Sequence, residues 1–142
     1  MGQQQLLLLV LGIVIVGLAV VAGIQAFQQN QQQSSIDAMA NEALRVATDI
    51  QAWRQKPEAL GGGQGNWPGT LKEVYPNNED VSGDEFVTPY GTITYNGSGG
   101  TDALNVDANA TADVNPDGTV DIPETGTPSF NATRTGEGDG GG

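Results

Sequence analysis

The chain has 142 residues and a formal net charge of −12, from 17 acidic and 5 basic residues, and it contains neither cysteine nor histidine. Without cysteine it holds no disulfide bond or thiolate metal site. Without histidine it lacks the commonest general base. The sequence also contains no nucleophile–base pair and no phosphate-binding loop, so we do not expect an enzyme.

The acidic excess belongs entirely to the second part of the chain. Residues 1–56 carry three acidic and three basic residues, whereas residues 57–142 carry 14 acidic residues against Lys72 and Arg134. Such a surface repels nucleic-acid phosphates, so we expect no nucleic acid bound to this part. It also keeps a protein hydrated in high salt, and a halophilic protein and an ordinary acidic secreted domain are both open interpretations.

Residues 6–24 form an uncharged, overwhelmingly apolar run of 19 residues. As a helix the run spans roughly 28 Å, close to the thickness of the hydrocarbon layer of a bilayer. It has no polar face, unlike a soluble core helix. Three interpretations are open: a cleaved secretory signal, a plain membrane anchor, and an assembly segment. The first five residues lack the lysine or arginine that is typical of a secretory signal.

Nothing in the polar, uncharged residues 25–35 forces the helix to end, because they contain no glycine or proline. Beyond them, apolar residues recur at three- and four-residue steps and predict an amphipathic helix. This predicted stripe comprises Ile36, Met39, Ala40, Ala43, Ala47, Ile50 and Trp53. Pro57 ends the pattern, and the glycines at 61–63 are expected to form a flexible link. We therefore predict one helix over residues 3–56, about 80 Å long if it is continuous.

Residues 57–134 are expected to form a small antiparallel β-rich head, which gives an α+β fold together with the long helix. Alternating patterns predict strands at residues 85–88, 91–95, 103–107, 110–114, 119–122 and 129–133, and a short helical turn at 70–75. Residues 89–91 are expected to form the turn of a hairpin. The predicted core of the head comprises Trp67, Leu71, Val74, Tyr75, Phe86, Val87, Tyr90, Ile93, Tyr95, Leu104, Val106, Val120, Ile122 and Phe130. The glycine-rich residues 135–142 are expected to be disordered.

Residues 113–124 match the spacing of a twelve-residue calcium-binding loop. The candidate Ca²⁺ ligands are Asp113, Asn115, Asp117, Thr119, Asp121 and Glu124. Gly118 takes the sixth position, where such a loop turns sharply. The alternative is a plain β-hairpin without an ion, because residues 115–118 are also a strong turn sequence.

Three sequons for N-linked glycosylation begin at Asn96, Asn109 and Asn131. Short motifs of this kind also arise by chance in a sequence rich in asparagine and threonine. The sequence therefore names three candidate sites and leaves their occupancy open.

The order of a minimal leader, a long helix with an apolar first half and a β-rich head resembles the type IV pilin and pseudopilin family. The resemblance implies cleavage between Gly2 and Gln3 by a prepilin peptidase. It also implies assembly through the apolar residues Leu6, Leu7, Leu8, Leu9, Val10, Leu11, Gly12, Ile13, Val14, Ile15, Val16, Gly17 and Leu18. The chain would be an atypical member, because Leu7 stands where the family usually has a glutamate and Gln3 where it usually has a phenylalanine.

The expected function is therefore structural, as a subunit of an extracellular pilus-like filament of identical copies. The precursor would sit in the cytoplasmic membrane with its head outside and would meet prepilin peptidase and an assembly machinery. Two alternatives are open. One is a monomeric surface protein held by its helix and carrying a calcium-binding head. The other is a pseudopilin of a secretion machine.

Overall fold

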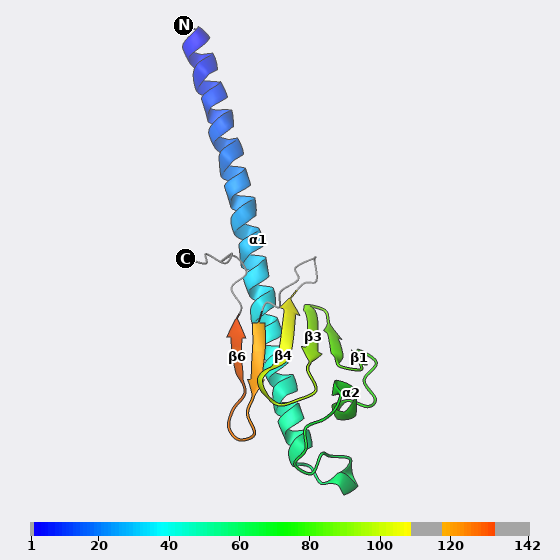
Figure 1. Cartoon of the computed structure of the whole chain (residues 1–142). Coiled ribbons are helices and arrows are strands. Elements are labelled where there is room, and N and C mark those ends of the chain that lie inside the picture. Colours follow the sequence, from blue (N-terminus) through cyan, green and yellow to red (C-terminus); the bar gives the residue numbers. More distant parts are fainter. Residues whose placement is uncertain (1, 109–117, 133–142) are drawn as a thin grey trace. The chain divides into compact units, whose positions relative to one another are not determined.

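The structure is a computed structural model that describes residues 2–108 and 118–132 (Figure 1). The side chains of Gln32, Thr101 and Asp102 are not described. The chain divides into two compact units, Met1–Ser34 and Ser35–Gly142, and each is treated by itself. The predicted strand at 110–114 and the tail at 135–142 lie outside the described residues.

One helix, α1, runs over Gly2–Gln55 and so confirms the predicted long N-terminal helix. The first unit consists of its N-terminal part. The second unit begins at Ser35, inside the helix, because the C-terminal part of α1 is packed into the head. The division thus falls where the apolar stripe begins and not where the helix ends.

The C-terminal part of α1 buries one face against the sheet. The fully buried residues of this face are Met39, Ala43, Val46, Ala47 and Ile50. Three- and four-residue steps place these positions on one side of a helix, as the sequence pattern indicates. Val46 was missing from the predicted stripe, whereas Ile36, Ala40 and Trp53 at its edges are only partly buried.

The residues after α1 fold back over the end of the helix. A 3₁₀ turn spans Glu58–Leu60, and Gly61 follows in the left-handed region at φ 81°. The backbone N–H groups of Gly63 and Gly65 then donate to the carbonyls of Trp53 and Arg54, at 3.0 and 2.7 Å. The expected flexible link is therefore wrong, because these glycines satisfy carbonyls that the helix end leaves without partners.

The head contains a six-stranded antiparallel sheet in the order β1-β2-β3-β4-β5-β6, so each strand pairs with the next one in the chain. The strands are β1 Val81–Ser82, β2 Glu85–Thr88, β3 Gly91–Tyr95, β4 Gly100–Ala108, β5 Gly118–Ile122 and β6 Ser129–Ala132. A short helix, α2, spans Leu71–Val74. The α+β layout is confirmed, and β2 and β3 have the predicted bounds. The two-residue strand β1 was not predicted, because it is too short to show a period.

The core lies between α1 and the face of the sheet that carries Ile93, Leu104 and Val120, all fully buried. The prediction that Val87 and Tyr90 belong to the core is wrong, since each residue is 54% exposed. In β2, Phe86 points into the core, so the next residue, Val87, points outward. Tyr90 lies in the two-residue turn between β2 and β3, outside the alternation of either strand.

Candidate assembly helix and head surface

The apolar residues of the predicted assembly segment lie in the first unit and are covered by nothing there. The exposure of their large side chains ranges from 52% for Val14 to 69% for Leu7. Within the described part of the chain, α1 is the one helix long and apolar enough to cross a membrane. A surface of this extent is unfavourable in water and needs lipid or protein to cover it.

Glycines interrupt this apolar surface at positions where the single chain does not need them. A Cβ atom added to Gly12, Gly17 or Gly23 would meet nothing within 4 Å. Glycine also weakens an isolated helix, by about 1 kcal/mol relative to alanine. Gly12, Gly17 and Gly23 therefore leave open surface along this part of α1.

The predicted processing site lies at the start of α1. Gly2 is its first residue, Gln3 follows, and both are exposed, with open space around the Gly2 Cα. Met1, the other residue of the predicted leader, lies outside the described residues. No contact within the described chain covers this peptide bond.

The structure describes three of the six predicted calcium ligands and places them in a strand and in the loop after it. Thr119 and Asp121 lie in β5, and Glu124 lies in the loop after it. The Asp121 carboxylate accepts a hydrogen bond from Asn131 at 3.2 Å, and the Glu124 carboxylate pairs with Arg54 at 3.3 Å. Nowhere in residues 2–108 or 118–132 do three acidic groups converge. Asp113, Asn115 and Asp117 lie outside these ranges, so the ion site stays a prediction.

The calcium motif implies a sharp loop turn at Gly118, whereas the structure places this glycine in a strand. It is buried in β5, where it pairs with Val106 of β4 and Ala132 of β6. A Cβ atom at Gly118 would lie 2.3 Å from the ring of Phe130. The glycine is therefore needed here so that the aromatic ring can lie directly against the strand backbone.

Arg54, in the last turn of α1, joins the helix to two loops of the head. Its Nε donates to the Gly65 carbonyl at 2.8 Å, and its guanidinium lies 4.6 Å from the centre of the Trp67 ring. The guanidinium also pairs with the Glu124 carboxylate, and the Arg54 side chain is 19% exposed. The planar, multidentate guanidinium suits such a three-way contact.

Two tyrosine hydroxyls are hydrogen-bonded inside the head. The Tyr75 hydroxyl donates to the Asp49 carboxylate of α1, and burial followed by this hydrogen bond raises the pKa of Tyr75. The Tyr95 hydroxyl donates to the Pro68 carbonyl at 3.1 Å. Burial, with smaller contributions from Asp84 and Glu73, raises the pKa of Tyr95 to about 12. Both groups therefore anchor structure and stay protonated at neutral pH.

The structure describes the asparagines of two of the three sequons. Asn96 is exposed after β3, and its side-chain oxygen accepts hydrogen bonds from the backbone N–H and the hydroxyl of Ser98, both at 3.1 Å. Asn131 is exposed in β6. Asn109 lies outside the described residues. Both described sites are thus reachable from solvent, and their occupancy stays a prediction.

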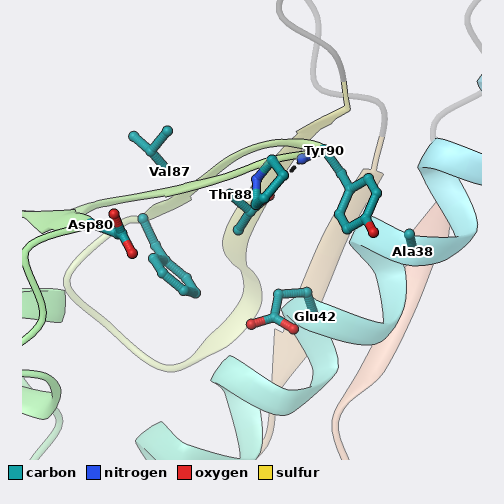
Figure 2. A pocket seen from close by; sticks show the side chains of 8 residues that line it. Ala38, Glu42, Asp80, Val87, Thr88 and Tyr90 are labelled. Carbon is teal, nitrogen blue, oxygen red and sulfur yellow. Dashed lines mark hydrogen bonds between the residues drawn. The ribbon is translucent and has the colours of Figure 1, made fainter.

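The head also carries a pocket of about 190 Å³ that the sequence did not predict. Its lining residues come from α1, from the residue before β1, from β2 and from the turn after β2. They are Ala38, Glu42, Asp80, Phe86, Val87, Thr88, Pro89 and Tyr90. Figure 2 shows the carboxylates of Glu42 and Asp80 on different sides of the pocket and the Tyr90 ring beside Ala38. The pocket combines apolar walls with two acids and has no basic lining residue.

No protein-family model matches the chain, no curated protein is significantly similar to it, and no solved structure matches its fold.

Proposed function

We propose that the chain is the structural subunit of an extracellular, type IV pilus-like filament that assembles through the apolar N-terminal part of α1. One observation carries the proposal. The helix that supplies one side of the head core also carries a 19-residue uncharged apolar segment, residues 6–24, whose large side chains are all more than half exposed.

The physical argument starts from what such a segment needs. It is stable in lipid, and it leaves lipid for water only if other apolar surface covers it. Each fully buried leucine, isoleucine or valine side chain contributes about 1.5–3 kcal/mol. A bundle of identical helices provides this cover, and head-to-tail repetition of one contact extends it without limit.

The open surfaces of Gly12, Gly17 and Gly23 support close packing of the helices in such a bundle. The acidic head would then face solvent, where its net charge keeps the filament soluble. On this proposal the precursor lies in the cytoplasmic membrane with its head outside, and a peptidase removes Met1 and Gly2 before assembly.

The test is a pair of leucine substitutions in the intact chain. Gly2→Leu changes the residue before the proposed cleavage point, whereas Gln28→Leu is a matched change at an exposed residue of the same helix. Cell-surface material is sheared off and viewed by negative-stain electron microscopy. We expect filaments from the wild type and from Gln28→Leu, and none from Gly2→Leu. Normal filaments from Gly2→Leu would refute the processing step. A wild-type protein that is recovered only as detergent-soluble monomers would favour a simple membrane-anchored surface protein.

A further inference from the structure

We propose that the pocket between α1 and the β2–β3 hairpin receives the Lys56 side chain of a neighbouring copy, so that heads join end to end. The proposal rests on the filament function proposed above and specifies a second contact for it, made by the heads.

The pocket suits a cation with an apolar stem. Its two charged lining residues, Glu42 and Asp80, are both acidic. Glu42 already pairs with Arg45 at 3.1 Å, whereas the Asp80 carboxylate has no ion pair within the described part of the chain. Tyr90 offers the face of a ring, which attracts a cation within about 6 Å of its centre. A volume of about 190 Å³ lies below the usual range for small-molecule sites and fits a side chain.

Among the basic side chains of the described head, Lys56 is the one available to pair with another copy. Arg45 pairs with Glu42, and the Arg54 guanidinium binds Glu124. The Lys72 ammonium donates to the backbone carbonyls of Asn78, before β1, and of Val81, in β1, at 2.6 and 3.1 Å. Lys56 is exposed, and within residues 2–108 and 118–132 its ammonium makes no ion pair or hydrogen bond. In a head with so large an acidic excess, a lysine with no partner among the described residues would be attracted to the acidic surface of another copy.

The position of Lys56 in the head makes the contact intermolecular. Lys56 directly follows α1, and Ala38 of the pocket lies 18 residues earlier along the same helix, about 27 Å away at the standard rise. A lysine side chain does not bridge that distance within one copy. Lys56 and the pocket are therefore two different surface patches, which lie near opposite ends of the part of α1 that packs in the head. Such a head-to-tail contact repeats without closing and generates an open filament.

The apolar walls would weaken the screening of this contact by salt. Exposed charge pairs are screened beyond roughly 3 Å in 1 M salt, whereas partly buried pairs are screened much less. Phe86 is 7% exposed and closes the inner wall of the pocket. Tyr90 and Val87, each 54% exposed, form an apolar rim that a partner would cover.

The experiment uses cysteine crosslinking on whole filaments, because the natural chain contains no cysteine. Val87→Cys places a thiol at the pocket rim, and Gln55→Cys places one beside Lys56, while all the proposed contact residues stay intact. Filaments of the double variant are treated with a short bifunctional thiol crosslinker and separated on a denaturing gel. We expect a ladder of dimers, trimers and higher species. Either single variant should stay largely monomeric, since a head-to-tail contact does not bring two identical positions together.

Charge reversal then tests the role of Lys56 in the double-cysteine background. Lys56→Glu should lower the crosslinked fraction several-fold, and adding Asp80→Lys should restore most of it. Filaments that form normally but give no ladder, or a ladder unaffected by Lys56→Glu, would overturn the head contact and leave the filament function standing. Absence of filaments from the wild type would overturn the filament function and this contact together.

Discussion

Replacing Ile50 by alanine should destabilise the head strongly, because Ile50 is fully buried between α1 and the sheet. The substitution removes three carbons from a packed core and leaves a cavity that the sheet does not fill. Changes of this kind cost about 2–5 kcal/mol. For a domain of roughly 100 residues, each kcal/mol lowers the melting temperature by about 4–8 °C. We therefore expect a loss of about 10 °C or more.

The same substitution elsewhere in the same helix provides the control. Ile15 is 57% exposed and lies in the first unit, outside the head core. Ile15→Ala should leave the melting temperature of the head unchanged within about 2 °C, since exposed substitutions are usually worth less than about 0.5 kcal/mol.

Tryptophan fluorescence of the full chain in detergent follows the head alone, because both tryptophans, Trp53 and Trp67, lie in the second unit. The melting temperatures of the wild type, Ile50→Ala and Ile15→Ala are compared in the same detergent. Equal losses in the two variants, or no loss in Ile50→Ala, would refute the division of α1 into an exposed part and a part that forms the head core.

Three further predictions concern the head. Its stability should fall between about pH 10 and about pH 12, and Tyr95 should account for about 3 kcal/mol of the fall, because the unfolded chain releases the Tyr95 proton near pH 10 while the folded head holds it to about pH 12. The raised pKa of Tyr75 should add to this fall. Urea unfolding at several pH values checks this, and Tyr95→Phe should reduce the fall. Gly62→Ala should lower the free energy of unfolding by about 1–3 kcal/mol, since the added Cβ would lie 2.3 Å from the Lys56 carbonyl oxygen. An unchanged melting temperature would contradict this, because it would mean that the turn adjusts without cost. Arg54→Lys should cost about 1 kcal/mol, because an ammonium does not reproduce the stacking on Trp67 together with the hydrogen bonds of a guanidinium. Equal unfolding midpoints for Arg54→Lys and the wild type would contradict that role.

The elements with a regular hydrophobic period were predictable from the sequence. Three- and four-residue steps from Met39 to Ile50 identified the buried face of α1, and alternation identified β2 and β3. These patterns are local, and each follows from the geometry of one helix or one strand. The long apolar segment was equally clear, because nothing but a lipid or protein neighbour suits so uniform a surface.

The features that depend on tertiary contacts were not predictable. The role of Arg54 appears only when the loops holding Gly65 and Glu124 fold against it. The pocket is built from separate segments that meet only in three dimensions. Gly118 fitted a calcium motif by spacing, yet its place in β5 follows from pairing on both sides. In each case residues distant in the sequence decide the outcome.

Val87 and Tyr90 show a further limit of composition-based reasoning. Both are apolar and were assigned to the core, although strand alternation turns Val87 outward and the hairpin turn leaves Tyr90 at the surface. In the proposed head contact the two exposed side chains form the rim of the pocket, because exposed large apolar residues of this kind are candidates for a docking surface.

The mass of the N-terminal peptide of the mature protein tests the central claim most directly. Surface material is sheared from cells, digested, and analysed by mass spectrometry. The account predicts a peptide that begins at Gln3, with its new N-terminus methylated or cyclised, in material that contains filaments. A peptide that keeps Met1, or that begins at Gly2 after loss of the initiator alone, would contradict processing and with it the proposed assembly through α1.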